Sequence, residues 1–179
     1  MSTVIDSDQH LFETRTMWRD HIDPGARDDA LAIEDDELGY AWLTWRGNKV
    51  QPVDVQRPGM TSAIGDWHER IRRGEPPTER YDDVLPRDYW DPAARAERLA
   101  TMGVDEAVVF PNFGLLWERT LDQSVPALTA NMTAWNRWCA SVVADGKRVV
   151  HPVAHLTLRD PRWLRNELAS LEAAGVRLA

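Results

Sequence analysis

Three polar side chains near the N-terminus have types and a spacing that suit metal binding: Asp6, Asp8 and His10. Residues two apart on a β-strand share a face, so a strand over residues 3–13 is expected to present all three on one side. Carboxylate oxygens together with an imidazole nitrogen suit zinc, manganese or iron better than calcium or magnesium. The pattern favours a site for such a metal, although Asp-x-His also occurs where it only ends a strand or lies in a solvated loop.

The segment Asp8-Gln9-His10, with Glu13 soon after, resembles the opening of the amidohydrolase-related (amidohydrolase 2) family. That family includes the aminocarboxymuconate-semialdehyde and resorcylate decarboxylases. Its first strand carries His-x-His or an acidic variant, and this chain has the acidic variant. Further matches follow in order along the chain, whereas residues from about 14 to 80 match loosely. These matches are Tyr89-Trp90-Asp91-Pro92, the segment from Met102 to Pro111, Asn136-Arg137-Trp138, and the segment from Val153 to Pro161.

The resemblance implies an α/β fold of the (β/α)8 TIM-barrel type. Because such barrels need about 250 residues and the chain has 179, it is expected to form one partial barrel domain of about four strands. The resemblance also implies that Asp8 and His10 are metal ligands, with zinc as the first choice and manganese or iron as alternatives. The family's remaining ligands and its general-base histidine would follow Ala179. We therefore assign no catalytic residue and expect the chain alone to be an incomplete enzyme.

Three functional interpretations remain open. A metal-dependent hydrolase acting on a small molecule is the broadest reading of the resemblance, and a non-oxidative decarboxylase (carboxy-lyase) of an aromatic or unsaturated acid is the second. A catalytically incompetent fragment or interaction module is the third, because half of the barrel is missing. The sequence lacks the Gly-x-Ser-x-Gly motif of α/β-hydrolases and the Gly-x-Gly-x-x-Gly motif of dinucleotide folds.

Substrate contacts are expected in the loops that follow the strands, because these loops build the site of a barrel. Asn112 and Phe113 would follow the second strand, and His155 and Arg159 the third. His155 shares a strand face with His151 by spacing. The family does not use this position as a ligand, so packing or a substrate contact is favoured for His155.

From residue 91 onward the sequence alternates regularly between helical and strand patterns. Asp-Pro pairs begin two of the helices and glycines end them, which is typical of helix caps. This alternation implies parallel strands joined by right-handed crossovers. The expected helices cover residues 92–102, about 123–144 and 161–174, and the expected strands cover residues 104–110, 149–156 and 176–179.

Residues 13–88 form an expected insertion after the first strand. Its first part, up to residue 40, has little periodicity and indicates loop or short helix. A β-hairpin is expected over residues 40–56 around Gly47-Asn48, with Pro52 confining its second strand to an edge. A short helix near residues 64–73 would follow. The acidic run at residues 34–37 is interpreted as a solvated surface, and His21 and His68 are expected to be exposed.

Composition limits the partners. The net charge of −8 disfavours nucleic acid and anionic membranes, which attract clustered Lys and Arg. No signal peptide or membrane span is indicated, so the expected location is the cytoplasm. The single cysteine, Cys139, lies among apolar residues at helical spacing and is expected to pack rather than react. The nine tryptophans are interpreted as core anchors rather than a substrate pocket. A free strand edge would favour homo-oligomers.

Overall fold

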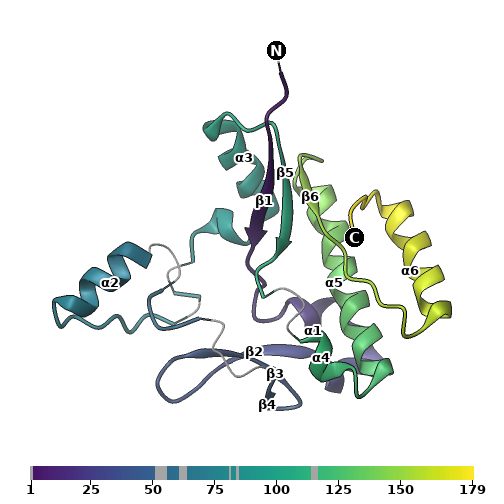
Figure 1. Cartoon of the computed structure of the whole chain (residues 1–179), viewed down its shortest axis with the longest axis horizontal. Coiled ribbons are helices and arrows are strands. Elements are labelled where there is room, and N and C mark those ends of the chain that lie inside the picture. The colour runs from purple at the N-terminus through teal and green to yellow at the C-terminus, as the bar shows by residue number, and fades with distance from the viewer. Residues whose placement is uncertain (1, 51–55, 61–63, 81, 84, 114–116) are drawn as a thin grey trace.

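The computed structural model describes residues 2–50, 56–60, 64–80, 82–83, 85–113 and 117–179. Its centre is a parallel sheet in the order β1 (Ile5–Leu11), β5 (Glu106–Pro111) and β6 (Val150–Pro152) (Figure 1). An isolated parallel bridge between Val153 and Leu178 lies where the expected last strand would pair. The carboxyl ends of these strands lie at one edge of the sheet, so the residues after them can share a site.

Three longer helices follow the strands as expected: α3 (Pro92–Met102), α5 (Val125–Asp145) and α6 (Pro161–Ala174). The side chains of Asp91 and Asp160 accept bonds from the first-turn N–H groups of α3 and α6. Gly103 and Gly175 follow these helices with φ angles of 72° and 78°, a left-handed conformation that glycine adopts without strain. The caps read from the sequence therefore set the helix limits.

The two faces of the parallel sheet have different surroundings. Alternate residues such as Leu11, Ala107 and Val109 are buried, and α5 and α3 contact the sheet. Residues on the opposite face are open, with Ile5 56% exposed and Phe110 36% exposed. An exposed sheet face that mixes apolar side chains with polar ones is a candidate for ligand contacts.

β6 is shorter than expected, ending at Pro152 rather than near residue 156. Beyond it, side chains of α5 bind the backbone. The indole Nε1 of Trp135 donates to the carbonyl of Val153 at 3.0 Å. The Asn136 amide accepts from the N–H of His155 at 2.8 Å and donates to its carbonyl at 2.9 Å. Backbone groups that a longer strand would pair are thus satisfied by a helix.

The insertion contains a second, antiparallel sheet of β2 (Leu31–Asp35), β3 (Ala41–Trp45) and β4 (Asn48–Lys49). Pairing of β3 with β4 confirms the hairpin, and its turn residues Arg46 and Gly47 have φ angles of 51° and 72°, as in a type I′ turn. The expected edge strand at Pro52 lies outside the described residues. β2 contradicts the expectation of loop or short helix for this part of the chain. Its strand pattern is the alternation of buried Leu31 and Ile33, and the acidic residues that follow obscured this pattern in the sequence.

The interpretation of the acidic run at residues 34–37 as a solvated surface is partly wrong. Asp35 lies at the end of β2 and pairs with Arg15 at 3.0 Å, and its side chain is 9% exposed. Glu34 accepts a hydrogen bond from the Thr44 hydroxyl at 2.6 Å. These residues hold the insertion together.

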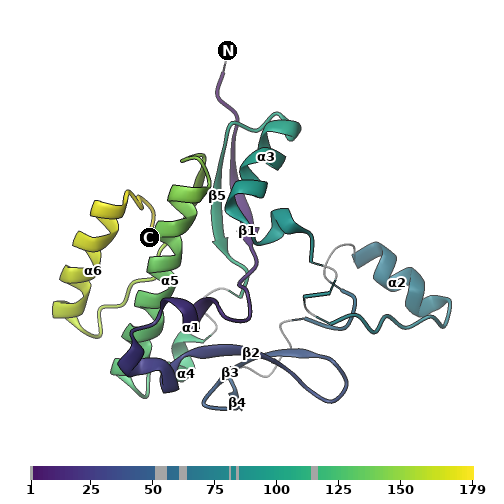
Figure 2. The ribbon, with the colours of Figure 1, turned by 180° about the vertical axis from the view of Figure 1, so that it is seen from behind.

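Shorter helical segments complete the described chain, and α1 (Met17–His21) packs against α5 (Figure 2). Cys139 is fully buried, and burial raises the pKa of its thiol. Core anchoring is confirmed for five tryptophans, namely Trp18, Trp45, Trp117, Trp135 and Trp138. No described helix has the length and apolar content needed to cross a membrane. The shorter segments are α1 (Met17–His21), η1 (Pro24–Asp29), α2 (Ile64–Arg72), η2 (Arg87–Tyr89) and α4 (Glu118–Leu121).

Candidate functional site

β1 is irregular at the residues that begin the expected metal motif. Asp6 pairs with Ala107 and Gln9 with Val109, so three steps along β1 match two along β5. This extra residue shifts the two-residue period by one position and exchanges the faces. Accordingly, Gln9 Nε2 donates to Asp6 Oδ2 at 2.9 Å, and Gln9 Oε1 accepts from Arg95 of α3 at 2.8 Å.

The prediction that Asp6 shares a face with Asp8 and His10 is therefore wrong. The carboxylate of Asp6 is directed toward Gln9 and also accepts the backbone N–H of Asp8 at 3.1 Å. These hydrogen bonds lower the pKa of Asp6. Asp6 supports the bulge and does not contribute to the pocket.

Asp8 and His10 remain together and line one cavity of about 490 Å³ on the open face of the sheet. The size is within the usual range for small-molecule pockets, which is about 300–1,000 Å³. The described lining combines three polar residues with apolar ones and contains no Lys or Arg: Asp8, His10, Phe110, Pro111, Val153, Ala154, His155, Leu156 and Ala179.

The orientation of His10 is set by the neighbouring strand. Its Nδ1 lies 3.0 Å from the carbonyl oxygen of Pro111. A carbonyl can only accept, so Nδ1 carries the hydrogen, and a neutral imidazole then keeps the lone pair of Nε2 for another partner. Metal-binding histidines are commonly oriented in this way by a backbone carbonyl. The donor set of Asp8 and His10 therefore fits a zinc, manganese or iron ion.

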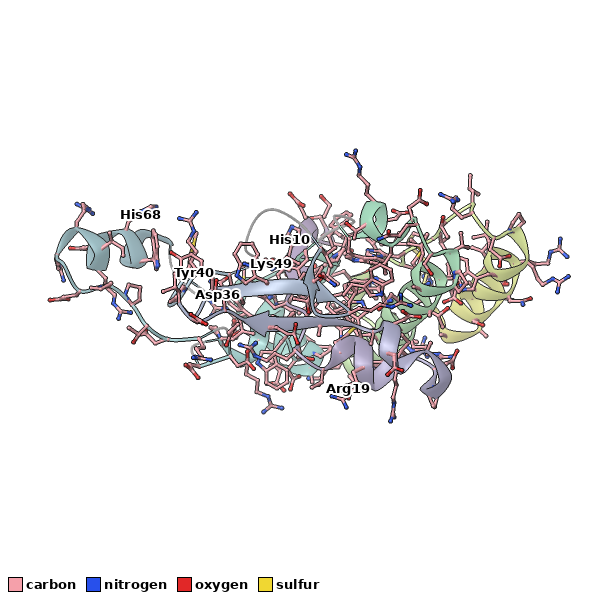
Figure 3. The ribbon with its side chains drawn as sticks, turned by 90° about the horizontal axis from the view of Figure 1, so that it is seen from below. His10, Arg19, Asp36, Tyr40, Lys49 and His68 are labelled. Carbon is pink, nitrogen blue, oxygen red and sulfur yellow. The ribbon has the colours of Figure 1, made fainter. Side chains whose placement is uncertain are left out.

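No third His, Cys, Asp or Glu among the described residues joins this pair in a group that could hold a metal. His68 is exposed on α2, far to one side of His10 (Figure 3). His21 was expected to be exposed but is half-buried, and this burial lowers its pKa. On the open sheet face, His151 Nε2 lies 2.6 Å from Glu106.

His155 lines the cavity and is 3% exposed. Its ring stacks on Trp135 at a centroid distance of 4.9 Å and lies 5.4 Å from the ring of Trp117. Neither ring nitrogen has a hydrogen-bond partner among the described residues. Burial lowers the pKa of His155 to about 3, so the imidazole is neutral near pH 7. The packing predicted for His155 is therefore seen, and its place in the cavity lining leaves the substrate contact as a prediction.

The other predicted substrate contacts lie elsewhere. Phe113 is 4% exposed and belongs to the core. Asn112 precedes it in the loop after β5, and Arg159 forms an ion pair with Asp122. None of these three side chains is part of the described cavity lining. Contacts between residues far apart in sequence, such as Arg159 with Asp122, leave no spacing signal in the sequence.

Glu13 is a buried acid that binds the loop after β5, and the sequence marked it only as part of the family resemblance. It is 1% exposed, and its Oε1 accepts the backbone N–H of Phe113 at 3.2 Å. Burial raises the pKa of Glu13 to about 8. An acidic residue directly after a strand was the available signal, but its burial could not be read from sequence.

No family model matches the chain, and a search of curated proteins finds no significant match. Among solved structures, the chain is similar to an amidohydrolase from Mycobacterium avium subsp. paratuberculosis, with 22% identity and a TM-score of 0.70. The fold is amidohydrolase-like. The match covers 97% of this chain and 47% of that one, so the chain spans about half the length of the structure it resembles. This likeness, at low identity, concerns the fold and not the reaction.

Proposed function

We propose that this chain forms the N-terminal half of a (β/α)8 metal-dependent hydrolase. In this proposal Asp8 and His10 bind one divalent ion, with zinc as the first choice. The supporting observation is that both side chains line one cavity while Pro111 orients the His10 ring, leaving Nε2 available. The likeness to an amidohydrolase fold supports the same reading.

Two protein ligands are too few for a catalytic zinc site, which usually has three and an open position. We propose that the remaining ligands come from the part of the barrel that the described residues do not include. A bound divalent ion would supply Lewis-acid activation of a substrate carbonyl or of water. In this chain, Asp8 and His10 would hold the ion, and the apolar residues of the cavity lining would contact the substrate beside it.

The proposed substrate is a small molecule with an apolar part that contacts Phe110, Val153 and Leu156. A carboxy-lyase acting on an aromatic or unsaturated acid is the second candidate function. In that case the metal would be the positive partner of the substrate carboxylate, since the described lining contains no Lys or Arg. Arg159, which the sequence predicted to contact the substrate, is paired with Asp122.

Metal binding is tested by calorimetric titration of the purified chain with zinc, manganese and iron(II). We expect Asp8→Ala and His10→Ala each to weaken binding by at least about tenfold, because each removes one of two ligands. Asp20→Ala is the control, since Asp20 is an exposed carboxylate on α1 that is not part of the described cavity lining. Equal losses in all three variants, or unchanged binding in Asp8→Ala and His10→Ala, would contradict the proposed site.

The reaction is tested by incubating any longer protein that contains this chain with esters, amides and aromatic carboxylic acids. Alcohol or amine release indicates a hydrolase, and carbon dioxide release without hydrolysis indicates the carboxy-lyase. Metal binding without either product would favour the interaction-module interpretation.

A further inference from the structure

Glu13 is a buried acid that binds the loop after β5 rather than the cavity. Its carboxyl group accepts the N–H of Phe113 at 3.2 Å and is also within hydrogen-bonding reach of the N–H of Asn112. Both N–H groups belong to the segment that immediately follows Pro111. One side chain from the end of β1 therefore holds the start of the loop after β5.

The same segment determines the state of His10. Pro111 is the last residue of β5 and pairs with Leu11 in the parallel ladder. Its carbonyl accepts from Nδ1 of His10 at 3.0 Å. Residues 111–113 thus carry the acceptor for His10 at one end and the donors for Glu13 at the other.

We propose that Glu13 is a positioning residue for His10: by fixing the backbone of residues 111–113, it holds the Pro111 carbonyl where it selects the Nδ1–H tautomer. The consequence for metal affinity rests on the proposed function. The tautomer itself does not, because it is a property of the metal-free protein.

A purely packing role for Glu13 is less consistent with its surroundings. Burying a carboxyl group is unfavourable unless its oxygens accept hydrogen bonds, so an apolar residue would fill the same space at lower cost. Burial raises the pKa of Glu13 to about 8, and in the neutral form an oxygen still accepts the backbone N–H groups. A glutamine can provide that acceptor in the same shape, whereas a leucine cannot.

The test compares Glu13→Gln with Glu13→Leu by nitrogen-15 NMR of the histidine rings, with metal removed by chelation. In the wild type and in Glu13→Gln, we expect His10 to be protonated at Nδ1 and unprotonated at Nε2. In Glu13→Leu, we expect a mixture of tautomers, because the Pro111 carbonyl is no longer held. If Glu13→Leu does not fold, Glu13→Asp replaces it, since its acid is one methylene too short to reach.

Glu167→Leu is the matched control, since Glu167 is another buried acid, 7% exposed, that binds Asn136 and Thr133 instead of the loop. We expect His10 in this variant to keep the wild-type tautomer. An unchanged tautomer in Glu13→Leu, or the same mixture in Glu167→Leu, would overturn the proposal.

Metal titration separates this inference from the proposed function. Residues that orient a metal ligand typically contribute about 10- to 100-fold to affinity, and Glu13 acts through the backbone, so Glu13→Leu should lower zinc affinity by roughly tenfold. Loss of the tautomer with unchanged zinc affinity would refute the link to metal binding while Glu13 remained the positioning residue. Failure of a longer protein that contains this chain to bind zinc would refute the proposed function alone.

Discussion

Nδ1 of His10 lies 3.0 Å from the carbonyl oxygen of Pro111, on the neighbouring strand. The ladder pairs His10 with Phe110, so the ring reaches one residue further along β5 to make this bond. The contact fixes the ring orientation and leaves Nε2 as the nitrogen without this bond. A metal ligand held in this way loses less rotational freedom on binding than a free side chain.

The variant His10→Asn distinguishes the role of Nδ1, which binds the Pro111 carbonyl, from the proposed role of Nε2 as the metal ligand. The asparagine amide can donate to Pro111 from roughly the position of Nδ1, but nothing takes the place of Nε2. We therefore expect metal binding to be lost while the free energy of unfolding changes by less than about 1 kcal/mol. Calorimetry with zinc and urea denaturation measure the two effects. Retained zinc affinity in this variant would show that Nε2 is not the ligand.

The sequence predicted the helices of the parallel region because their caps are local signals. Asp91 and Gly103 mark the ends of α3 through bonds to the nearest residues. The displacement of Asp6 was not predictable in the same way. The bulge lies within Asp6 to Gln9, a stretch without Gly or Pro, and its partners include Arg95, which is 86 positions away from Gln9. Tertiary contacts therefore decided which carboxylate faces the cavity.

His155 should make the protein less stable in acid. The folded pKa is about 3, against 6.5 for an ordinary histidine. Below the higher value the unfolded chain takes up a proton that the folded state does not, so stability is lost as the pH falls from 6.5 toward 3. The loss is at most about 5 kcal/mol.

His155→Phe keeps an aromatic ring between Trp117 and Trp135 but cannot be protonated. Urea denaturation across this pH range should show the variant gaining stability relative to the wild type as the pH falls. The other acidic and basic groups are common to both proteins and cancel in the difference. A constant difference would show that His155 is solvated or hydrogen-bonded in solution.

Glu13 should have the opposite effect on the pH dependence of stability, because it lowers stability as the pH rises. Its pKa is raised from 4.5, the ordinary value for a glutamate side chain, to about 8 in the folded protein. The folded state therefore binds a proton that the unfolded state has released, and the associated stability, complete below pH 4.5, is lost as the pH rises through about 8. Glu13→Gln cannot ionise, so we expect it to become more stable than the wild type above about pH 8, by up to about 5 kcal/mol.

The measurement for Glu13 is again urea denaturation of the wild type and of Glu13→Gln over the pH range. The quantity compared is the unfolding free energy of the wild type minus that of the variant. Between pH 4.5 and 6.5 the contributions of Glu13 and His155 have opposite slopes, so the wild type alone would not reveal either. If the difference in unfolding free energy is constant up to about pH 9, the pKa of Glu13 is not raised in the folded protein.

Asn136 and Asn131 provide a matched pair for testing what holds the cavity wall. Both are buried amides of α5 with three hydrogen bonds each. Asn136 binds the backbone of His155 and the carboxylate of Glu167, whereas Asn131 binds the start of β2. We expect alanine at either position to cost about 2–4 kcal/mol of unfolding free energy, because buried backbone groups lose their partners.

Only Asn136→Ala should alter the cavity, because His155 and its neighbours Ala154 and Leu156 line it and Asn131 does not reach it. The readouts are the ring resonances of His155 and the binding of a small apolar probe such as toluene, followed by NMR in both variants. In Asn136→Ala, we expect the His155 signals to shift and toluene binding to weaken severalfold, while Asn131→Ala keeps wild-type values for both. Equal effects in the two variants would mean that the wall depends on the overall stability of α5, and unchanged His155 signals in Asn136→Ala would mean that the stacking on Trp117 and Trp135 is sufficient to hold it.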